Sequence, residues 1–446
     1  MSAKDTIAAI ATASGTGGIG IIRISGDNAK KIGEILTASD LVDKTIQFRQ
    51  FYDARKQVLD YGICLYFVGP QSFTGEDIVE IQAHGSPILL DMLLERICQL
   101  GARLARAGEF SERAFTHGKL NLAQAEAIAD LIEASSRAAA KAAMRSLQGS
   151  FSNQIYDLVG DIIHLRSHIE ATFDFTDEAV DFITADKVIN QLQDCQQKIN
   201  QSLEKAAQGL ILKEGLNVVL AGLPNAGKSS LLNYLAGYEA AIVTEIPGTT
   251  RDVLREHISL KGIPIRLYDT AGLHKTDNRV EQEGIKRAWQ KISQADMILL
   301  LVDVKKGITA ADRQIIEQLK RQAFNYKLIY SKADLRIESC QHEMEGLYIS
   351  THSGEGMNAL IDTIAGGHLD YNQGEQTILA RRRHIDALQR AAGSLEQAIR
   401  VFWDVGPGEL MAEDLRIVQQ YLGEITGEFT SEDLLGQIFS RFCIGK

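Results

Sequence analysis

The chain has 446 residues, of which 45% are hydrophobic and 24% charged, and its formal net charge is −11. This length predicts about three domains, and the composition is that of an ordinary soluble protein. The negative charge argues against a globally basic nucleic-acid binder, so any contact with RNA requires a local basic patch.

The five cysteines occur singly, at Cys64, Cys98, Cys195, Cys340 and Cys443. Because there is no C-x-x-C pair, we expect a reducing compartment and neither a disulfide framework nor a zinc site. The first residues lack the apolar or Arg-rich character of a targeting segment, and the longest apolar run, 297–302, is too short to span a bilayer. We therefore expect a cytoplasmic protein with no membrane contact.

The first 118 residues have the pattern of an α+β domain. Alternating patterns predict strands over 6–11, 19–24, 60–68 and 77–82, and helical periodicity predicts helices over 28–36 and 87–100. Residues 15–20 also spell G-x-G-x-x-G, but a strand follows where a dinucleotide site needs a helix. A β-hairpin is therefore the better interpretation.

Two charged residues of this segment, Arg23 and Glu80, each stand between apolar residues within a predicted strand. By pattern alone, each is expected to point to solvent from a half-buried strand.

Helical periodicity dominates two further segments, one on each side of the middle of the chain. The helices are predicted over 120–149, 153–173 and 184–208, and over 379–403, 409–422 and 431–442. These two incomplete sets predict one helical body into which the middle segment is inserted. The densest basic cluster, 381–384, begins the second set, and a solvated helix face is favoured there over RNA contact.

The middle segment, 211–372, carries the most informative motif of the chain. Gly222-Leu-Pro-Asn-Ala-Gly-Lys-Ser229 has the spacing G-x-x-x-x-G-K-S and lies between a strand pattern and a helix pattern. Its glycines let backbone N–H groups turn toward a triphosphate, and the helix N-terminus adds a positive dipole end. We expect Lys228 to reach the β- and γ-phosphates and Ser229 to bind Mg²⁺.

Two motifs downstream are those of a nucleotide hydrolase. Asp269-Thr-Ala-Gly272 follows a predicted strand, where a carboxylate can hold the hydration shell of Mg²⁺ and a glycine N–H can sense the γ-phosphate. Gly248-Thr-Thr-Arg-Asp252 lies between the motifs and supplies hydroxyl groups. Thr250 is our candidate for the second side-chain ligand of Mg²⁺.

Ser331-Lys-Ala-Asp334 stands where GTPases carry N-K-x-D. The Asp334 carboxylate can accept from N1–H and the exocyclic amine of guanine, whereas adenine presents an acceptor at N1, so guanine is favoured. Ser331 replaces the usual Asn, and Ser350-Thr-His352 replaces S-A-K. Both departures concern guanine binding.

The hydrolytic step needs a group that orients water and a group that neutralises charge. GTPases of the Ras type place Gln after D-T-A-G, but this chain has the apolar Leu273. From the chemistry alone, the candidates are Asp277, Glu281 and Glu283, together with a cation near Asn225. The residues do not decide among them, and each acid could also be an ordinary surface residue.

The chain resembles a known family over nearly its whole length. The resemblance rests on the following runs: Asp5-Thr-Ile7, Gly18-Ile-Gly-Ile-Ile-Arg-Ile-Ser25, Ser72-Phe-Thr-Gly-Glu-Asp77, Gly108-Glu-Phe-Ser-Glu-Arg-Ala-Phe115, Ala123-Gln-Ala-Glu-Ala-Ile-Ala-Asp130, Gly427-Glu-Phe-Thr430 and Phe442-Cys-Ile-Gly-Lys446. These runs are similar to those of the MnmE (also called TrmE) family of tRNA-modification GTPases.

The resemblance implies a multidomain fold. It has an α+β N-terminal folate-binding and dimerising domain at 1–118, a discontinuous all-α helical domain at 119–210 and 373–446, and an inserted α/β Ras-like P-loop GTPase domain at 211–372. The second helical part ends in the Cys-Ile-Gly-Lys tail.

The resemblance also implies roles for individual residues. Asn225, Thr244, Ile246 and Thr249 would coordinate K⁺, and Glu281 would orient the water. Arg23, Glu80, Lys119 and Lys446 would contact folate, which reverses the solvent-facing interpretation of the first two. Cys443 would take part in the modification chemistry.

With the motifs, the resemblance gives a predicted GTP-binding set in five runs of sequence. These are Asn225, Ala226, Gly227, Lys228, Ser229 and Ser230; Thr244, Glu245, Ile246, Pro247, Gly248, Thr249 and Thr250; Asp269, Thr270, Ala271 and Gly272; Ser331, Lys332, Ala333 and Asp334; and Ser350, Thr351 and His352. Mg²⁺ would be held by Ser229, by Thr250 and, through water, by Asp269.

The implied function is a K⁺-activated GTPase that acts on tRNA as a homodimer joined through the N-terminal domain. With MnmG, an FAD- and NADH-dependent flavoprotein, it would use a one-carbon unit from 5-formyltetrahydrofolate or a related tetrahydrofolate. The product is an aminomethyl or carboxymethylaminomethyl group at C5 of the wobble uridine. One alternative is a ribosome-assembly GTPase that binds rRNA and modifies nothing. Another is a scaffold that does not hydrolyse GTP.

Overall fold

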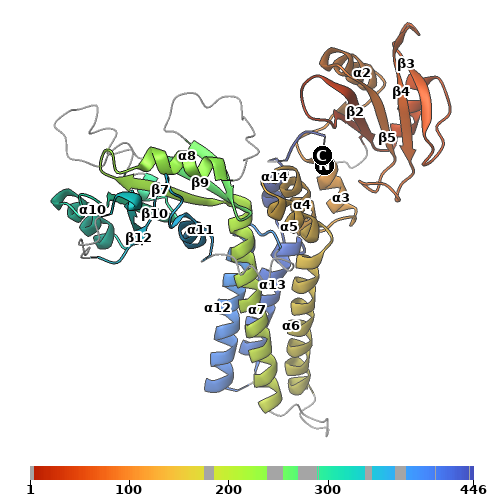
Figure 1. Cartoon of the computed structure of the whole chain (residues 1–446). Coiled ribbons are helices and arrows are strands. Elements are labelled where there is room, and N and C mark those ends of the chain that lie inside the picture. Colours follow the sequence, from red (N-terminus) through yellow and green to blue (C-terminus); the bar gives the residue numbers. More distant parts are fainter. Residues whose placement is uncertain are drawn as a thin grey trace. The chain divides into compact units, whose positions relative to one another are not determined.

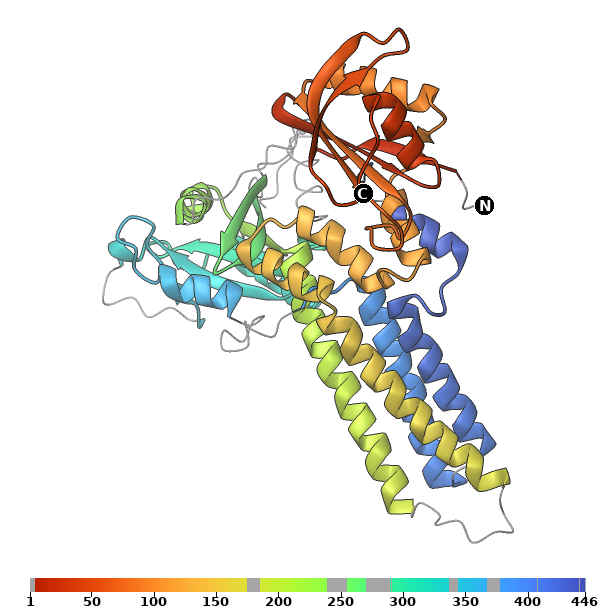
Figure 2. The same ribbon diagram turned by 90° about the vertical axis from the view of Figure 1, so that its right-hand side faces the viewer.

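The fold is that of a computed structural model (Figures 1 and 2), which describes residues 5–174, 185–238, 255–269, 289, 291–336, 344–366, 378–406, 408–440 and 442–445. The chain forms two compact units. The first consists of Met1–Ala129, Ser146–Gln196 and Arg390–Lys446, and the second of Asp130–Arg145 and Gln197–Gln389. No helix in these described ranges is long and apolar enough to cross a membrane.

The first unit begins with a six-stranded sheet in the order β3-β4-β5-β2-β1-β6. Its strands are β1 Ile7–Ile10, β2 Gly17–Ser25, β3 Gln47–Tyr52, β4 Val58–Phe67, β5 Ile78–Gly85 and β6 Arg103–Leu104. The neighbours are antiparallel except β1 and β6, which run parallel. The predicted hairpin is confirmed, because β1 pairs antiparallel with β2 and places Ala9 opposite Arg23.

The two faces of this sheet have different environments. Alternate residues such as Ile22, Ile24 and Ile81 are buried against helices α1 (Ala29–Thr37) and α2 (Pro87–Gln99), which pack on one face. On the other face, Phe110 of α3 (Glu109–Thr116) packs at the β1 end of the sheet. Near β3, the same face leaves Phe48 and Tyr61 exposed.

The helical elements follow the predicted pattern with one difference. They are α4 Leu122–Ile132, α5 Arg137–Leu147, α6 Ser150–Asp174, α7 Ala185–Glu214, α12 Arg382–Asp404, α13 Glu409–Thr426 and α14 Glu432–Phe439. The helix predicted over 120–149 is wrong as a single element. Ser136 begins a new helix there, because its Oγ accepts from the Ala139 N–H at 3.1 Å.

The two helical sets that flank the middle segment pack on each other, as predicted. Within the first unit, α6 packs against α13, and Arg166 donates to Gln419 Oε1 at 2.7 Å. The end of the chain also belongs to this unit, since Phe439 and Phe442 pack with Leu122 and Phe115. These contacts bring α14 to α3, and the Gly108 N–H donates to the Cys443 carbonyl at 3.3 Å.

A buried carboxylate fastens α3 to the edge of the N-terminal sheet. Glu109, only 2% exposed, accepts from two guanidinium nitrogens of Arg103 at 2.5 and 2.9 Å and from the Arg106 N–H at 2.8 Å. Burial opposes ionisation of this carboxyl. The hydrogen bonds and the arginine charges outweigh burial and lower the pKa of Glu109 to about 2.

We expect Glu109→Gln to lower the free energy of unfolding at neutral pH by about 2–3 kcal/mol, because the charged hydrogen bonds are lost. Glu112→Gln, on the same helix but partly exposed, should change it by about 0–1 kcal/mol. The pKa of Glu109 lies below its usual 4.5, so its contribution is complete above about pH 4.5 and is lost as the pH falls toward 2. Urea unfolding should therefore show the difference between wild type and Glu109→Gln shrinking over that range, and a difference independent of pH contradicts this account.

The second unit contains a six-stranded sheet in the order β12-β11-β10-β7-β9-β8. The elements are β7 Leu216–Gly222, β8 Arg255–Leu260, β9 Ile263–Asp269, β10 Met297–Asp303, β11 Tyr326–Ser331 and β12 Leu347–Tyr348, with helices α8 Lys228–Tyr238, α10 Ala310–Arg321 and α11 Met357–Ala365. All neighbours run parallel except β8 and β9. The carboxyl ends of β7, β9 and β11 therefore meet at one edge, where ligands bind in such sheets. This sheet, the first unit's sheet and the helices confirm the predicted multidomain class.

Candidate functional site

The phosphate-binding loop joins β7 to α8 in a conformation that requires glycine at its start. Gly222 has φ +142°, and a Cβ on it would lie 2.4 Å from the Leu301 carbonyl oxygen of β10. Strand β7 is buried along almost its whole length, so the hydrophobic core fixes the position at which the loop begins. The predicted strand, loop and helix are all confirmed.

Lys228, the first residue of α8, is held inside this loop. It is only 8% exposed, and its Nζ donates to the carbonyl oxygens of Gly222 at 2.9 Å and Leu223 at 3.0 Å. Burial lowers the pKa of Lys228, while the charge of Asp269 acts in the opposite direction. A phosphate here would give the ammonium the close negative charge that two carbonyls do not supply.

Ser229 and Asp269 lie together, and their oxygens fit a magnesium ion. Ser229 Oγ lies 3.3 Å from Asp269 Oδ2. The other oxygen, Asp269 Oδ1, is buried without a hydrogen-bond partner among the described residues. A buried carboxylate oxygen normally has a partner, and a hydroxyl beside a carboxylate is a donor set that Mg²⁺ prefers.

Ser331 and Lys332, at the end of β11, tie the predicted guanine motif to the phosphate loop. Ser331 is 4% exposed, and its Oγ donates to the Ala226 carbonyl at 2.7 Å. Lys332 Nζ donates to the Asn225 carbonyl at 3.0 Å and to Asp303 Oδ2 at 2.6 Å. Serine at the usual Asn position therefore still bonds to the phosphate loop. Burial opposes ionisation of Asp303, but the hydrogen bonds from Lys332 and the Lys305 N–H, together with the nearby lysine charges, outweigh burial and lower the pKa of Asp303.

Asp334 presents its carboxylate at the exposed rim of this site. Oδ1 accepts from Ser350 Oγ at 2.5 Å, and Ser350 is fully buried. Ser350 Oγ in turn accepts from the backbone N–H groups of His352 and Ser353 at 3.2 and 3.1 Å. The structure thus brings the motifs 331–334 and 350–352 together, and Ser350 orients the carboxylate.

Part of the predicted GTP and metal set lies outside the described residues. These residues are Thr244, Glu245, Ile246, Pro247, Gly248, Thr249, Thr250, Thr270, Ala271, Gly272 and Glu281. Of the predicted K⁺ ligands, only Asn225 is described. It adopts the left-handed conformation, with φ +65°.

Two of the predicted folate residues form a half-buried ion pair in the N-terminal sheet. The β2–β5 register places Arg23 opposite Glu80, and Arg23 Nε donates to Glu80 Oε1 at 2.8 Å. The Arg23 guanidinium lies 5.3 Å from the Phe73 ring centre and 5.7 Å from that of Phe110. The solvent-facing interpretation from pattern alone is therefore wrong for both residues, because Phe73 and Phe110 lie against Arg23 and Glu80 is paired with Arg23.

The C-terminal tail reaches the same place, whereas Lys119 lies at another contact. Arg23 NH1 lies 3.5 Å from the Gly445 carbonyl oxygen. Lys119 Nζ donates to the Pro70 carbonyl at 2.9 Å, in the loop that also supplies Phe73. Cys443 is exposed as a free thiol, and Lys446 lies outside the described residues. Phe73 and Phe110 belong to runs of sequence that carry the family resemblance. No other pattern in the sequence indicates that they flank Arg23.

The basic cluster at 381–384 is engaged within the second unit. Arg381 NH2 lies 2.7 Å from Asp130 Oδ1, which also accepts from Lys213 Nζ at 2.6 Å. Arg382 pairs with Glu214 at 2.8 Å. The solvated-face interpretation is wrong for Arg381, whose side chain is only 18% exposed. Its partner Asp130 could not be predicted from a charge run.

Comparison with known proteins places the chain in a family. The sequence profile described as "MnmE helical domain" matches residues 122–443, and the one described as "GTP-binding protein TrmE N-terminus" matches residues 6–119. Among solved structures, an Aquifex aeolicus Era variant bound to GDP.AlF4- is 21% identical, with a TM-score of 0.29 over 40% of this chain and 66% of that one.

Two curated relatives match over their full length. A tRNA modification GTPase MnmE of Pseudomonas syringae pv. syringae (strain B728a) is 52% identical, over 99% of both chains. One of Acinetobacter baylyi (strain ATCC 33305 / BD413 / ADP1) is 50% identical, over 100% of this chain and 98% of that one. The chain therefore belongs to the MnmE family of tRNA modification GTPases.

Proposed function

We propose that the chain is a Mg²⁺-dependent, K⁺-activated GTPase whose cycle drives a tRNA-modifying complex. The observation that carries the GTPase part is the buried Lys228 beside Asp269, whose Oδ1 has no partner among the described residues, with Asp334 at the same sheet edge. The relatives named above are tRNA modification GTPases, which supports tRNA as the substrate.

In this proposal, each residue of the site has one task. Lys228 binds the β- and γ-phosphates, and Ser229, Thr250 and Asp269 hold Mg²⁺, which neutralises charge on the transferred phosphoryl group. Asp334 selects guanine, and Ser350 and Ser331 keep that motif in place. Glu281 orients the attacking water.

The proposed K⁺ site consists of Asn225, Thr244, Ile246 and Thr249. A cation next to the phosphate loop would neutralise the charge that an arginine finger neutralises in other GTPases. Asn225 adopts the left-handed conformation, with φ +65°, which asparagine tolerates better than most residues.

The modification chemistry is proposed for the N-terminal domain and the tail. Arg23, Lys119 and Lys446 would bind the acidic part of a tetrahydrofolate such as 5-formyltetrahydrofolate, and Glu80 would accept N–H groups. When bound, the folate supplies the one-carbon unit. Cys443 takes part near it, and an MnmG-type FAD- and NADH-dependent partner completes the aminomethyl or carboxymethylaminomethyl group at C5 of the wobble uridine.

We further propose that the chain divides into the segments 1–118, 119–210, 211–372 and 373–446. We also propose that it forms a homodimer in the cytoplasm, joined through the N-terminal domain. The exposed part of the N-terminal sheet supports this interface. Phe48 of β3 and Tyr61 of β4 are 67% and 48% exposed, on a face that neither α1 nor α2 covers. Neighbouring exposed aromatic side chains mark a protein interface.

We expect Phe48→Asp to convert the dimer to a monomer, because a charge in the centre of an apolar interface is left without a partner. Light scattering after size-exclusion chromatography measures this. Ile88→Asp is the matched control, since Ile88 is 74% exposed but lies on α2, on the other side of the sheet. A dimer that survives Phe48→Asp, or one that is lost equally in both variants, places the interface elsewhere.

The test of this function is the wobble nucleoside in cells. Cells without the protein should lose the C5 modification, wild type should restore it, and Cys443→Ser should fail to restore it. Cys98→Ser, at a partly buried cysteine of α2, should restore it as wild type does. An unchanged wobble nucleoside in cells without the protein favours the ribosome-assembly alternative.

A further inference from the structure

Arg113 of α3 belongs to a buried polar network that has no role in the function proposed above. Only 11% of its side chain is exposed, and its NH1 donates to both carboxylate oxygens of Glu76 at 3.0 Å each. The Glu76 side chain is likewise only 10% exposed, and it lies in residues 68–77, the loop that joins β4 to β5. Charges this well buried are costly unless they are paired. The ion pair therefore ties α3 to the β4–β5 loop.

Further hydrogen bonds hold both partners of this ion pair. Arg113 also donates to the Asp5 carbonyl at 2.9 Å and to Asp5 Oδ1 at 3.1 Å. Glu76 Oε2 accepts from Ser25 Oγ at 2.7 Å, and Ser25 Oγ lies 2.7 Å from Thr74 Oγ1, with both hydroxyl residues fully buried. Because Ser25 has one hydroxyl proton and gives it to Glu76, Thr74 is the donor to Ser25. The bonds thus run from the β4–β5 loop through β2 to α3.

The β4–β5 loop carries Phe73, whose ring lies 5.3 Å from the Arg23 guanidinium. The second ring near this guanidinium, that of Phe110, is fully buried at the end of the sheet, so packing fixes its position. Phe73 is only partly buried, and its position depends more on the bonds of the loop. Phe110 and Arg113 are three residues apart on α3 and therefore lie on the same side of the helix. The helix that supplies one ring thus also supplies the cation that holds the other.

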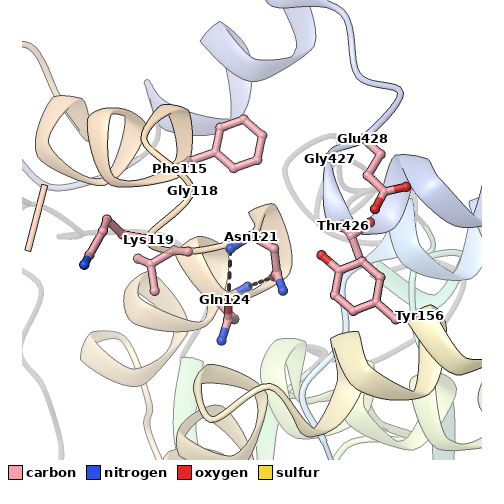
Figure 3. Close-up of a pocket in the computed structure, with 10 residues that line it drawn as sticks. Phe115, Gly118, Lys119, Asn121, Gln124, Tyr156, Thr426, Gly427 and Glu428 are labelled. Atoms are coloured by element: carbon pink, nitrogen blue, oxygen red, sulfur yellow. Dashed lines mark hydrogen bonds between the residues drawn. The ribbon is translucent and has the colours of Figure 1, made fainter. Parts of the chain in front are cut away.

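Two weaker contacts join the same loop to the residues that follow α3. His117 Nδ1 lies 2.8 Å from the Thr74 carbonyl, and because a carbonyl can only accept, Nδ1 carries the proton. Lys119 Nζ donates to the Pro70 carbonyl at 2.9 Å. Figure 3 shows the Lys119 ammonium turned away from a neighbouring pocket of about 320 Å³. Both contacts come from exposed residues, so the buried ion pair is the stronger tie.

We propose that Arg113 is a positioning residue of the Arg23–Glu80 site. With Glu76 it holds Phe73 against Arg23, which keeps the guanidinium in one orientation and partly shields it from water. A guanidinium prepared in this way binds an acidic group more tightly, because less order has to be gained on binding and its charge is less screened. Arg113 does not touch the ligand itself. This proposal rests on the proposed function, in which Arg23 contacts a tetrahydrofolate.

The test is a double-mutant cycle in which isothermal titration calorimetry measures binding of 5-formyltetrahydrofolate to the full chain. Arg113→Lys keeps the charge but loses the fork that reaches Glu76 and Asp5 together. It should weaken binding about tenfold. Phe73→Leu keeps an apolar side chain but removes the ring, and it should weaken binding by about the same factor. The double variant should bind no more weakly than Phe73→Leu alone, because Arg113 acts only through that ring.

Arg106→Lys is the matched control. Arg106 lies just before α3, its side chain is 55% exposed, and it pairs with Glu112 at 3.0 Å. Among the described residues, it makes no hydrogen bond or ion pair to the β4–β5 loop. This control should bind the folate as wild type does.

A second variant separates the loss of the ion pair from a loss of folding. Arg113→Met combined with Glu76→Gln removes both charges, so no buried charge is left without its partner. The combined variant should unfold close to the wild-type temperature and still show the tenfold loss of folate binding.

Wild-type affinity in Arg113→Lys overturns the proposal. A double variant whose loss is the product of the two single losses also overturns it, because Arg113 then acts independently of Phe73. If the wild-type chain binds no 5-formyltetrahydrofolate, the folate part of the proposed function is wrong, and hydrogen exchange decides the role of Arg113. Arg113→Lys should then raise the exchange of the backbone amides of 72–77 several-fold, and Arg106→Lys should not. Equal exchange in the two variants overturns the positioning role.

Discussion

We expect the Lys228→Met variant to hydrolyse GTP about 100- to 1,000-fold more slowly than the wild-type chain. That is the usual loss when one preorganised donor to a developing charge is removed. Lys228 is buried at the start of α8 and bonded only to the carbonyls of Gly222 and Leu223 among the described residues. Methionine keeps the length of the side chain, so the loss reports on the ammonium. Steady-state release of phosphate at saturating GTP measures it.

The matched control for this variant is Lys327→Met, on strand β11. Lys327 belongs to the same unit but is exposed. It should hydrolyse GTP at the wild-type rate. Equal losses in the two variants indicate a general effect of the substitution, and wild-type turnover in Lys228→Met removes this lysine from the catalytic site.

The second large effect is a change of base specificity in Asp334→Asn. The carboxylate is proposed to accept from both N1–H and the exocyclic amine of guanine. Asn can accept from N1–H but turns its own N–H toward the amine. We expect a loss of about 3 kcal/mol in GTP binding, roughly 100-fold in Kd. Xanthosine triphosphate carries a carbonyl at C2 in place of the amine, so the variant should prefer it to GTP.

Equilibrium titration with labelled GTP, xanthosine triphosphate and ATP tests this change. The Asn side chain can still accept from Ser350 Oγ, which lies 2.5 Å from Asp334 Oδ1 in the wild-type chain, so the motif should keep its shape. ATP should remain a poor ligand of both proteins. If Asp334→Asn binds GTP as the wild type does, Asp334 does not contact the base.

The elements that the sequence predicted correctly are those with strong periodicity. The strand before the phosphate loop, the helices α6 and α13 and the first hairpin could all be predicted, because their apolar residues recur with a regular period. Strand β3 was missed, since Gln47–Tyr52 carries an exposed Phe48 and a buried Gln47 in place of clean alternation. The break between α4 and α5 was missed because it depends on one serine cap.

The sequence predicted the chemistry of the site, but it did not predict the contacts that support the site. The family and the GTPase were predicted from motifs and are confirmed by the relatives. Motif spacing says nothing of contacts across the sheet, so the Ser331 bond to Ala226 and the Lys332 bonds to Asn225 and Asp303 could not be predicted. These contacts join strands that are close only in the folded chain.

The most direct test of the central claim, K⁺-activated GTP hydrolysis, is the rate of hydrolysis in KCl and in NaCl at equal ionic strength. Wild type should be accelerated many-fold by K⁺, and Glu281→Ala should lose turnover in both salts. Asp277→Ala and Glu283→Ala, the other two carboxylates of that segment, should behave as wild type. Equal rates of wild type in the two salts contradict the potassium site at Asn225, and turnover that survives in Glu281→Ala assigns the water to another group.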